Sequence, residues 1–216
     1  MGLQLIWLGL AALCAGGSFL LFRHLYLDHL KHLPVTLHLA EAPLSQGGRQ
    51  FGAVVSDDHA VGKIGELITG LMMAAEGWRQ IPSQPGGVHG LDGLFVRHLH
   101  GSGAYEIQFV ETKTSRDGSG VRNYAPTQMT DEKIIAELEK LQSADYKFDG
   151  KPYIDARVAH SLIHAIRHKS MWISKRLFAH TLSTGTTVVF PIAANGTLVR
   201  RPAGVVKQIS NEAHRY

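Results

Sequence analysis

An uncharged apolar stretch at the start of the chain restricts the fold more than any other part of the sequence. Residues 2–22 contain no Lys, Arg, Asp or Glu, and their only polar side chains are Gln4 and Ser18. A helix of this length rises about 31 Å, which matches the roughly 30 Å hydrocarbon core of a bilayer. We therefore expect residues 1–22 to form one transmembrane helix.

Two other interpretations of this stretch are a cleaved signal peptide and a buried helix. A signal peptide usually carries basic residues before its apolar part, whereas no Lys or Arg precedes Leu3. Arg23 and Lys31 follow the stretch, and the positive-inside rule then places the rest of the chain in the cytoplasm. We expect a single-pass protein of a bacterial-type inner membrane that contacts lipid through residues 2–22.

The rest of the chain has the composition of a folded protein. Hydrophobic residues make up 44% of the sequence and charged residues 19%, which excludes a disordered or collagen-like chain. The only cysteine is Cys14, which excludes a disulfide framework and a zinc cluster of thiolates. Lys and Arg number 22 against 18 Asp and Glu, an excess that permits a polyanionic partner without establishing one. We expect a juxtamembrane connector over residues 23–50 and one domain over residues 51–216.

Hydrophobic periodicity predicts an α/β domain. Apolar residues at helical spacing predict a helix from Ser56 or Asp57 to near Gly77. Two strand-like runs follow, over residues 92–100 and 105–114, with a four-residue loop between them. The later elements that we expect are a helix over residues 131–142 with Thr130 as its N-cap, a helical region over residues 154–182, and a last hairpin over residues 186–200 that turns at Asn195-Gly196.

The two strand-like runs bring three ionisable side chains to one face of a predicted hairpin. If His100 pairs with Tyr105 across the loop, Asp92 lies opposite Lys113 and diagonal to Glu111. Because side chains alternate along a strand, all three share the apolar face that a helix would cover. Ionisable groups there cost free energy unless they are paired or bind a cation. Two carboxylates with open coordination positions suit Mg²⁺.

The preceding helix offers a further carboxylate, Glu66. It shares a helix face with residues whose small or slim side chains allow close approach to a sheet, namely Gly62, Thr69, Gly70 and Met73. Glu66 is therefore a candidate metal ligand or a group that positions water. The alternative interpretation is an ordinary cross-strand ion pair between Asp92 and Lys113, with Glu66 solvated on the helix surface.

At these positions the chain resembles the PD-(D/E)XK, or restriction-endonuclease-like, nuclease superfamily. The matching motifs are Gly65-Glu66 in the helix, His-Gly-Leu-Asp-Gly at residues 89–93, Val-Glu-Thr-Lys at residues 110–113 and Gln-Met-Thr-Asp at residues 128–131. The last motif is similar to a Gln-Met-Ser/Thr-Asp segment of toxin-type and phage-associated members. The sequence departs from the pattern in having no proline before Asp92, and nothing after Tyr146 matches.

The resemblance implies a core of a helix, an antiparallel strand hairpin, a helix and further strands. It assigns Mg²⁺, with Mn²⁺ as a substitute, to Asp92 and Glu111, and the attacking water to Lys113. Less directly, it assigns a metal and catalytic role to Glu66 and a catalytic role to Gln128. The implied function is a membrane-anchored, metal-dependent nuclease that hydrolyses phosphodiester bonds, above all in DNA. The alternative is a catalytically inactive, membrane-tethered nucleic-acid-binding or scaffold protein with the same fold.

Basic residues outside the hairpin are candidates for contacts with nucleic-acid phosphates. Those that we single out are Arg116, Arg122, Lys169, Lys175 and Arg176. Charged residues at this density more often form only a solvated surface. Nucleases of this type often work as dimers, which makes a second copy of the chain a candidate partner, although the sequence indicates no heptad pattern or apolar interface patch.

Overall fold

The computed structural model describes residues 57–83, 91–99, 104–143, 147–148, 151–199 and 204–207. The expected transmembrane helix over residues 1–22 and the connector over residues 23–50 lie outside these ranges. Among the described residues, no helix is long and apolar enough to cross a bilayer.

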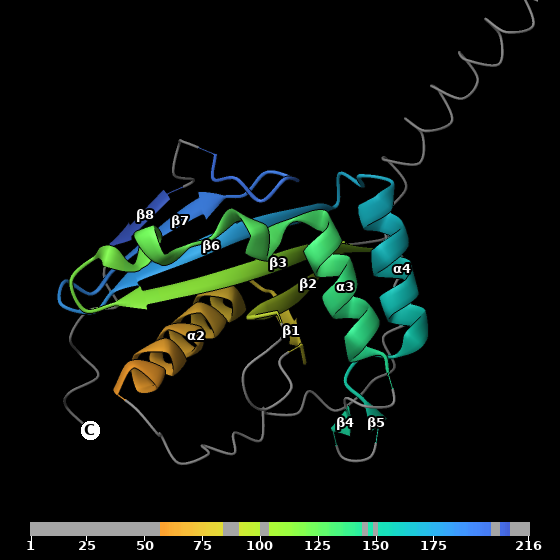
Figure 1. Cartoon of the computed structure of the whole chain (residues 1–216), viewed down its shortest axis with the longest axis horizontal. Coiled ribbons are helices and arrows are strands. Elements are labelled where there is room, and N and C mark those ends of the chain that lie inside the picture. Colours follow the sequence, from red (N-terminus) through yellow and green to blue (C-terminus); the bar gives the residue numbers. More distant parts are fainter. Residues whose placement is uncertain are drawn as a thin grey trace, which may run out of the picture.

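The described residues form a mixed α/β fold that combines three α-helices with a six-stranded sheet (Figure 1). The helices are α2 (Asp57–Ala75), α3 (Asp131–Leu141) and α4 (Ala156–Arg167), with the 3₁₀ helices η1 (Ser119–Asn123) and η2 (Pro126–Met129) before α3. The strands of the sheet are β1 (Arg79–Ile81), β2 (Gly93–Leu99), β3 (Ala104–Ser115), β6 (Ile173–Thr181), β7 (Thr186–Pro191) and β8 (Gly204–Lys207). A separate small hairpin consists of β4 (Lys147–Phe148) and β5 (Lys151–Pro152).

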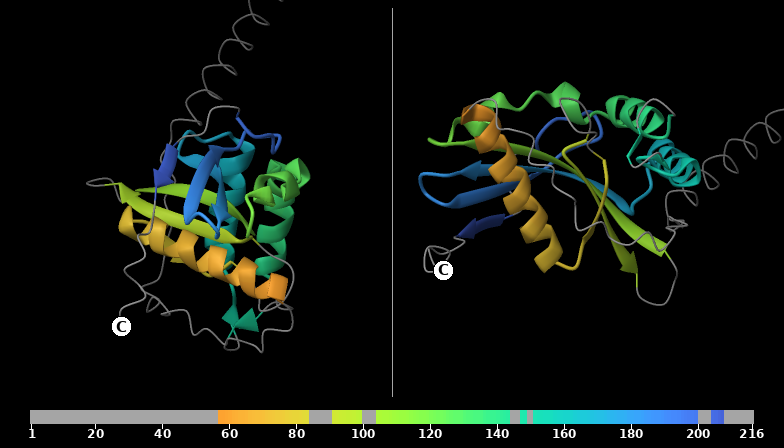
Figure 2. Two further views of the ribbon diagram at one scale, coloured as in Figure 1. Left: turned by 90° about the vertical axis from the view of Figure 1, so that its left-hand side faces the viewer. Right: turned by 90° about the horizontal axis from the view of Figure 1, so that it is seen from below.

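The sheet has the strand order β1-β2-β3-β6-β7-β8. Neighbouring strands are antiparallel except β3 and β6, which are parallel. A parallel pair needs a crossover, and the chain makes it through η1, η2, α3, the small hairpin and α4. Helix α2 lies on one face of the sheet, and α3 and α4 lie on the other (Figure 2). The result is a sheet between two helical layers.

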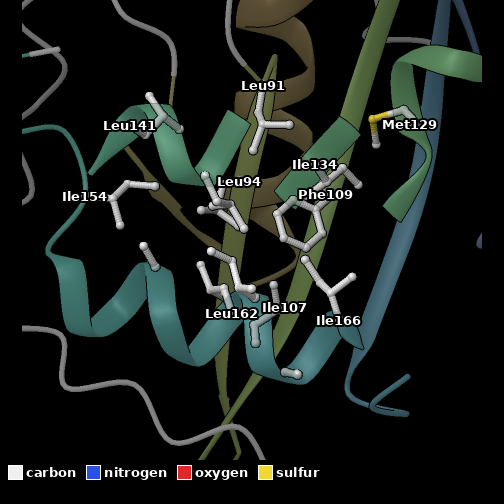
Figure 3. Close-up of a cluster of buried hydrophobic side chains, with 14 of the residues drawn as sticks. Leu91, Leu94, Ile107, Phe109, Met129, Ile134, Leu141, Ile154, Leu162 and Ile166 are labelled. Carbon is white, nitrogen blue, oxygen red and sulfur yellow. The ribbon is translucent and has the colours of Figure 1, made fainter. Parts of the chain in front are cut away.

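The two faces of the sheet carry separate apolar clusters. The larger cluster joins β2 and β3 to α3 and α4, and its fully buried members include Leu94, Phe109, Leu138 and Leu162 (Figure 3). The smaller cluster lies under α2 and consists of Met73, Trp78, Phe95, Val110, Phe178 and Val189. Strand β3 contributes alternate residues to both clusters, as the period of two in a strand requires.

The hairpin of β2 and β3 forms as predicted, but its register differs by two residues from the expected one. His98, instead of His100, lies opposite Tyr105. Because the difference is an even number, every side chain keeps its predicted face. One residue beyond the last pair, Gly93 and Val110, the same register places Asp92 opposite Glu111 and no longer opposite Lys113.

The predicted helical region over residues 154–182 is wrong in its second half. Helix α4 ends at Arg167, Lys169 adopts a left-handed backbone conformation with φ 51°, and the chain then enters strand β6. This strand is buried on both faces, with Leu177 in the larger cluster and Phe178 in the smaller one. Because buried Lys175 and His180 interrupt the apolar residues and both faces are covered, the strand has no alternation of apolar and polar residues that would separate it from a helix.

The start of α3 and the turn of the last hairpin follow the prediction more closely. The Thr130 side chain accepts a hydrogen bond from the backbone N–H of Lys133 at 3.2 Å, which confirms the N-cap. The predicted turn at Asn195-Gly196 is present, but it follows β7 and closes on a single bridge between Ile192 and Leu198. The main partners of β7 are instead β6 and β8.

Helix α2 also presents a row of apolar side chains to solvent among the described residues. Ile64, Leu67 and Leu71 are spaced by three and four residues, and all three are exposed. The sequence did not indicate this apolar patch, because the periodicity of α2 is apolar on nearly every side.

Candidate active site

The structure brings Asp92 and Glu111 together where β2 begins and β3 nears its end. Asp92 precedes β2 by one residue, and Glu111 lies on β3. By strand alternation both belong to the face that carries Leu94 and Phe109, which lie two residues from them in the sequence (Figure 3). The backbone N–H of Thr112 donates to the Oδ2 atom of Asp92 at 2.9 Å. This bond holds the Asp92 carboxylate against the strand that carries Glu111.

Lys113 completes the predicted trio. Its Nζ atom lies 2.7 Å from the Oε1 atom of Glu111, and the two residues share the same face of β3. The Glu111 side chain is 9% exposed and that of Lys113 is 21% exposed. The carboxylate is therefore buried, while the ammonium group retains access to solvent.

The electrostatics of the site centre on Asp92. Burial is the largest of the effects that raise the pKa of its carboxyl to about 7, and the negative charges of Glu111 and Glu66 act in the same direction. The N–H of Thr112 and the charge of Lys113 act in the opposite direction but do not outweigh burial. A carboxyl group that keeps its proton because it is buried and lies near other carboxylates is a position where a cation would be favoured.

Glu66 lies in the helical layer on the opposite face of the sheet from Asp92 and Glu111, so α2 does not cover the face that carries these carboxylates. It lies on α2, forms a 2.7 Å ion pair with Lys63, and its charge contributes to the raised pKa of Asp92. The residue that allows α2 to approach the sheet closely is Gly65, where a Cβ atom would overlap with the Thr114 side chain on β3. The expected role of Gly62 is wrong, because a Cβ atom there would have no neighbour within 4 Å.

Gly70, the other glycine expected to permit close approach, does not lie against the sheet. The nearest atom to a Cβ at Gly70 would be Oε1 of Gln80 on β1, at 3.9 Å, which is an ordinary contact. Thr69 and Met73 do face the sheet as predicted, since both are buried. The docking surface of α2 therefore runs along Gly65, Thr69 and Met73.

The donor set fits a hard cation with an incomplete protein shell. Among the described residues, no three His, Cys, Asp or Glu side chains lie close enough together to hold a metal ion. Asp92 and Glu111 would therefore supply two carboxylates, and water or phosphate oxygens the other ligands. Mg²⁺ is commonly bound in this way, whereas structural zinc requires four protein ligands. In this arrangement Glu66, the third carboxylate that the resemblance assigns to the metal, would be a neighbouring charge that could hold a metal-bound water.

Gln128 lies in η2, where it has a structural role. Its Oε1 atom accepts a hydrogen bond from the backbone N–H of Ala125 at 3.2 Å, which closes the turn. The residue of this segment that approaches the site is Tyr124. Burial and the charge of Glu111 raise the pKa of Tyr124 to about 12, and its hydroxyl donates to the carbonyl of Gly196 at 2.6 Å. Nothing in the local sequence pattern distinguished this tyrosine.

Lys175 does not have the position expected of a phosphate ligand. It is 7% exposed, and its Nζ atom donates to the carbonyls of Met129 at 2.8 Å and Ala194 at 3.1 Å and pairs with the Asp131 carboxylate. These contacts fasten the segment between β3 and α3 to the turn after β7. The burial of Lys175 corrects the prediction that it contacts nucleic acid.

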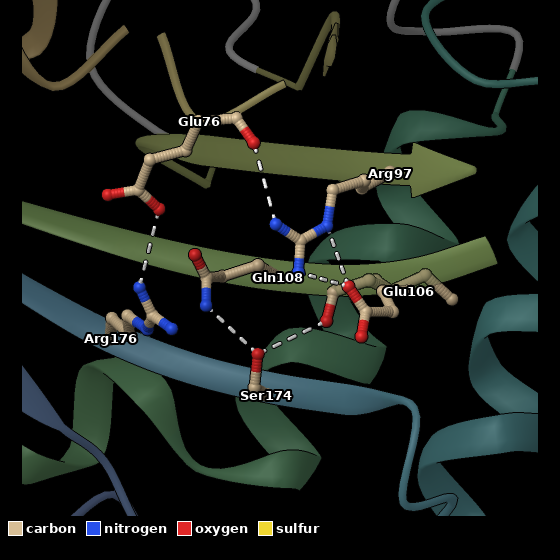
Figure 4. A network of polar contacts seen from close by, with 7 residues as sticks. Glu76, Arg97, Glu106, Gln108, Ser174 and Arg176 are labelled. Atoms are coloured by element: carbon tan, nitrogen blue, oxygen red, sulfur yellow. Dashed lines mark hydrogen bonds and ion pairs between the residues drawn. The ribbon is translucent and has the colours of Figure 1, made fainter. Parts of the chain in front are cut away.

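The other predicted phosphate contacts do not form one surface. Arg116 and Arg122 are exposed and follow the end of β3, a few residues beyond Lys113. Lys169 is exposed after the end of α4 and lines a shallow pocket together with Lys175. Arg176 lies on the α2 side of the sheet, 3.9 Å from the Glu76 carboxylate (Figure 4). Only the first two arginines are adjacent in sequence to the strand that carries Glu111.

Comparisons with known protein families, curated proteins and solved structures find no match for this chain.

Proposed function

We propose that this chain is a membrane-anchored, Mg²⁺-dependent nuclease with a restriction-endonuclease-like core. The observation that carries the proposal is the pairing of Asp92 and Glu111 across two adjacent strands, with Lys113 on the same face. The order of elements also supports it. A helix is followed by three antiparallel strands, two further helices and a strand parallel to the third, which agrees with the core that the motifs imply.

Each side chain of the site has a distinct part in the proposed hydrolysis. Asp92 and Glu111 would hold Mg²⁺, and the bound ion would supply charge to polarise a non-bridging phosphate oxygen and to lower the pKa of water. The Lys113 ammonium group orients the attacking water and stabilises the negative charge that develops on the phosphate oxygens. Water gives up a proton to solvent as its oxygen forms a new bond to phosphorus, the phosphorus–oxygen ester bond breaks, and the departing oxygen takes a proton from solvent. Glu66 orients water at the edge of the site.

The membrane anchor over residues 2–22 and the cytoplasmic position of the domain belong to the same proposal. They follow from the uncharged stretch and from Arg23 and Lys31 after it. An anchor would confine cleavage to nucleic acid near the inner membrane. Arg116 and Arg122 are the basic residues best placed by sequence to contact its phosphates, since they follow the strand of Glu111 and Lys113.

A second function, nucleic-acid binding or scaffolding without catalysis, is favoured by one contact. Lys113 and Glu111 form an ion pair at 2.7 Å, so these two charges are compensated without a metal ion. The two functions differ in their dependence on divalent cations. A scaffold would bind nucleic acid equally well with Mg²⁺ or with a chelator and would produce no fragments.

The test is cleavage of linear, circular and single-stranded DNA and of RNA by the purified full chain, with Mg²⁺, Mn²⁺ or a chelator. We expect Asp92→Asn, Glu111→Gln and Lys113→Met each to abolish metal-dependent cleavage in a folded protein. Glu106→Gln is the matched control, because Glu106 is a carboxylate of the same strand that pairs with Arg97 instead. Cleavage that survives in all three variants, or fragments that form equally in chelator, would contradict the proposal.

A further inference from the structure

A chain of mostly buried hydroxyl and imidazole groups lies between α2 and the sheet, and the mechanism above does not use it. Thr69 on α2 lies 3.1 Å from the Thr112 hydroxyl on β3 and 2.8 Å from the Nε2 atom of His180 on β6, measured from its own Oγ1 atom. The Nδ1 atom of His180 lies 2.7 Å from the Thr187 hydroxyl on β7. Four side chains from one helix and three strands are thus joined by hydrogen bonds.

Three of the four side chains of this polar chain are buried, since Thr69 and His180 are each 2% exposed and Thr187 is 6% exposed, whereas Thr112 is partly exposed. A neutral imidazole has one donor and one acceptor nitrogen, and each nitrogen has a hydroxyl partner here. Burial lowers the pKa of His180 to about 4, so the ring is neutral near pH 7 and fits this pattern. Polar groups in such a position specify one arrangement of the elements they join, because any displacement leaves a buried group unpaired.

The polar chain meets the sheet directly behind the candidate active site. Thr112 lies between Glu111 and Lys113 in β3, and its backbone N–H holds the Asp92 carboxylate. Its side chain points to the opposite face, where it meets Thr69. One turn earlier in α2, Gly65 lies against the Thr114 side chain of the same strand. Helix α2 is therefore fixed to β3 at two points one turn apart.

Glu66 lies between those two points in the sequence of α2. We propose that Thr69 and His180 are positioning residues that fix α2 against β3, so that the Glu66 carboxylate stays at the end of the strand that carries Glu111 and Lys113. The proposal rests on the proposed function, since it gives the position of Glu66 a purpose at the metal site. Neither residue touches the reacting groups or bonds to a candidate metal ligand. They act through the position of the helix.

The test compares Thr69→Val, which keeps the shape and removes the hydroxyl, with Thr69→Ser, which keeps the hydroxyl. Binding of Mn²⁺ to the full chain is measured by isothermal titration, and melting temperature is recorded for each variant. We expect Thr69→Val to weaken Mn²⁺ binding by about 10-fold, the lower limit for residues that bond directly to a metal ligand, and Thr69→Ser to retain it. His180→Leu should weaken binding in the same way, and His180→Gln should restore part of it.

Coupling to Glu66 separates positioning from general destabilisation. In a Glu66→Gln background, we expect Thr69→Val to cause no further loss of Mn²⁺ affinity, because the carboxylate that it positions is absent. A lower melting temperature with unchanged Mn²⁺ affinity, or equal losses in both backgrounds, would overturn the positioning role while leaving the metal site intact. Failure of the unmodified chain to bind Mn²⁺ would instead overturn the proposed function, and this inference with it.

Discussion

The two faces of the sheet are stabilised in different ways, although the same strand, β3, serves both. On the side of α3 and α4, large aliphatic and aromatic side chains such as Phe109 and Leu138 are fully buried in a broad cluster. On the side of α2, the cluster is smaller, and the contact continues through Gly65 and the polar chain of Thr69 and His180. Apolar burial supplies stability without direction, whereas close contact and hydrogen bonds specify a position.

The polar character of the α2 side continues beyond the end of the helix. Gln108 on β3 donates to the Ser174 hydroxyl on β6 at 3.0 Å, and Arg97 donates to Glu106 at 2.8 Å (Figure 4). Arg97 also lies over the Trp78 ring, 4.5 Å from its centroid. This comparison leads to the expectation that substitutions on the α3 and α4 side mainly change stability. Substitutions at the contact of α2 with β3 should also change the Mn²⁺ affinity of the proposed metal site.

The largest expected effect is on the apolar side. Phe109→Ala should lower the free energy of unfolding by about 3–5 kcal/mol, because it empties a fully buried position. Chemical denaturation with intrinsic fluorescence measures the loss. The comparison predicts that Mn²⁺ affinity of the fraction that remains folded changes little. A ten-fold loss of affinity without a loss of stability would reverse the roles that we assign to the two faces.

Lys175 and Arg176 are consecutive basic residues of β6 whose side chains lie on opposite faces of the sheet, so they form a matched pair for substitution. Lys175→Met should lower the free energy of unfolding by about 2–3 kcal/mol, because it leaves the partly buried Asp131 carboxylate without its cation. Arg176→Met should cost less than about 1 kcal/mol, since its 3.9 Å pair with Glu76 is half-exposed. Urea denaturation of both variants checks the difference. Equal losses of unfolding free energy in the two variants would mean that the burial of Lys175 does not add to the cost of removing its charge.

Two glycines of α2 provide the next comparison. Gly65→Ala should lower the free energy of unfolding by about 1–3 kcal/mol and weaken Mn²⁺ binding, because the added methyl group overlaps with Thr114. Gly62→Ala should instead raise stability by up to about 1 kcal/mol, since its Cβ has open space and alanine favours the helix. Thermal unfolding and Mn²⁺ titration distinguish them. Unchanged Mn²⁺ affinity in Gly65→Ala would mean that the position of α2 does not influence the proposed metal site.

The smallest effects are expected in pH dependence, and the two faces should respond in opposite directions. The pKa of Asp92 is raised to about 7, so between about pH 4 and 7 the folded chain keeps a proton that the unfolded chain has lost. In metal-free buffer its contribution to stability therefore falls as pH rises through this range. Asp92→Asn should remove this slope, with a gain on the order of 1 kcal/mol above pH 7 after allowance for partial exposure. An unchanged slope in Asp92→Asn would contradict the raised pKa.

On the α2 face the sign is reversed. The pKa of His180 is lowered to about 4, so between about pH 6.5 and 4 the unfolded chain binds a proton that the folded chain does not. Its contribution to stability is complete above pH 6.5 and is lost as pH falls towards 4. His180→Gln should flatten the acid limb of the stability curve. Denaturation at a series of pH values in the presence of a chelator provides the measurement. If stability fell with pH as steeply in His180→Gln as in the unmodified chain, the lowered pKa of His180 would be contradicted.

The sequence predicted the parts of the fold that depend on local pattern and on the alternation of side chains between the two faces of a strand. Alternation within the β2–β3 hairpin placed Asp92, Glu111 and Lys113 on one face, and this survives a register difference of two residues because parity is kept. The N-cap at Thr130 followed from the preference of its hydroxyl for the first turn of a helix. These features depend on residues close together in the chain.

The features that the sequence did not reveal depend on contacts between distant segments. The sequence of strand β6 predicts a helix, because both faces of the strand are buried and apolar and polar residues do not alternate along it. The burial of Lys175 follows from carbonyls of Met129 and Ala194, which no spacing rule brings together. The bonds of His180 to Thr69 and Thr187 likewise need the assembled sheet and helix.

Binding of Mn²⁺ tests the central claim most directly, because the proposed hydrolysis depends on a divalent cation between Asp92 and Glu111. The loss of the free Mn²⁺ electron paramagnetic resonance signal on titration with the full chain at pH 8 gives the number of ions bound. We predict that the unmodified chain and the Glu106→Gln control bind Mn²⁺, whereas Asp92→Asn and Glu111→Gln do not. Equal binding by all four proteins, or none by the unmodified chain, would contradict the account.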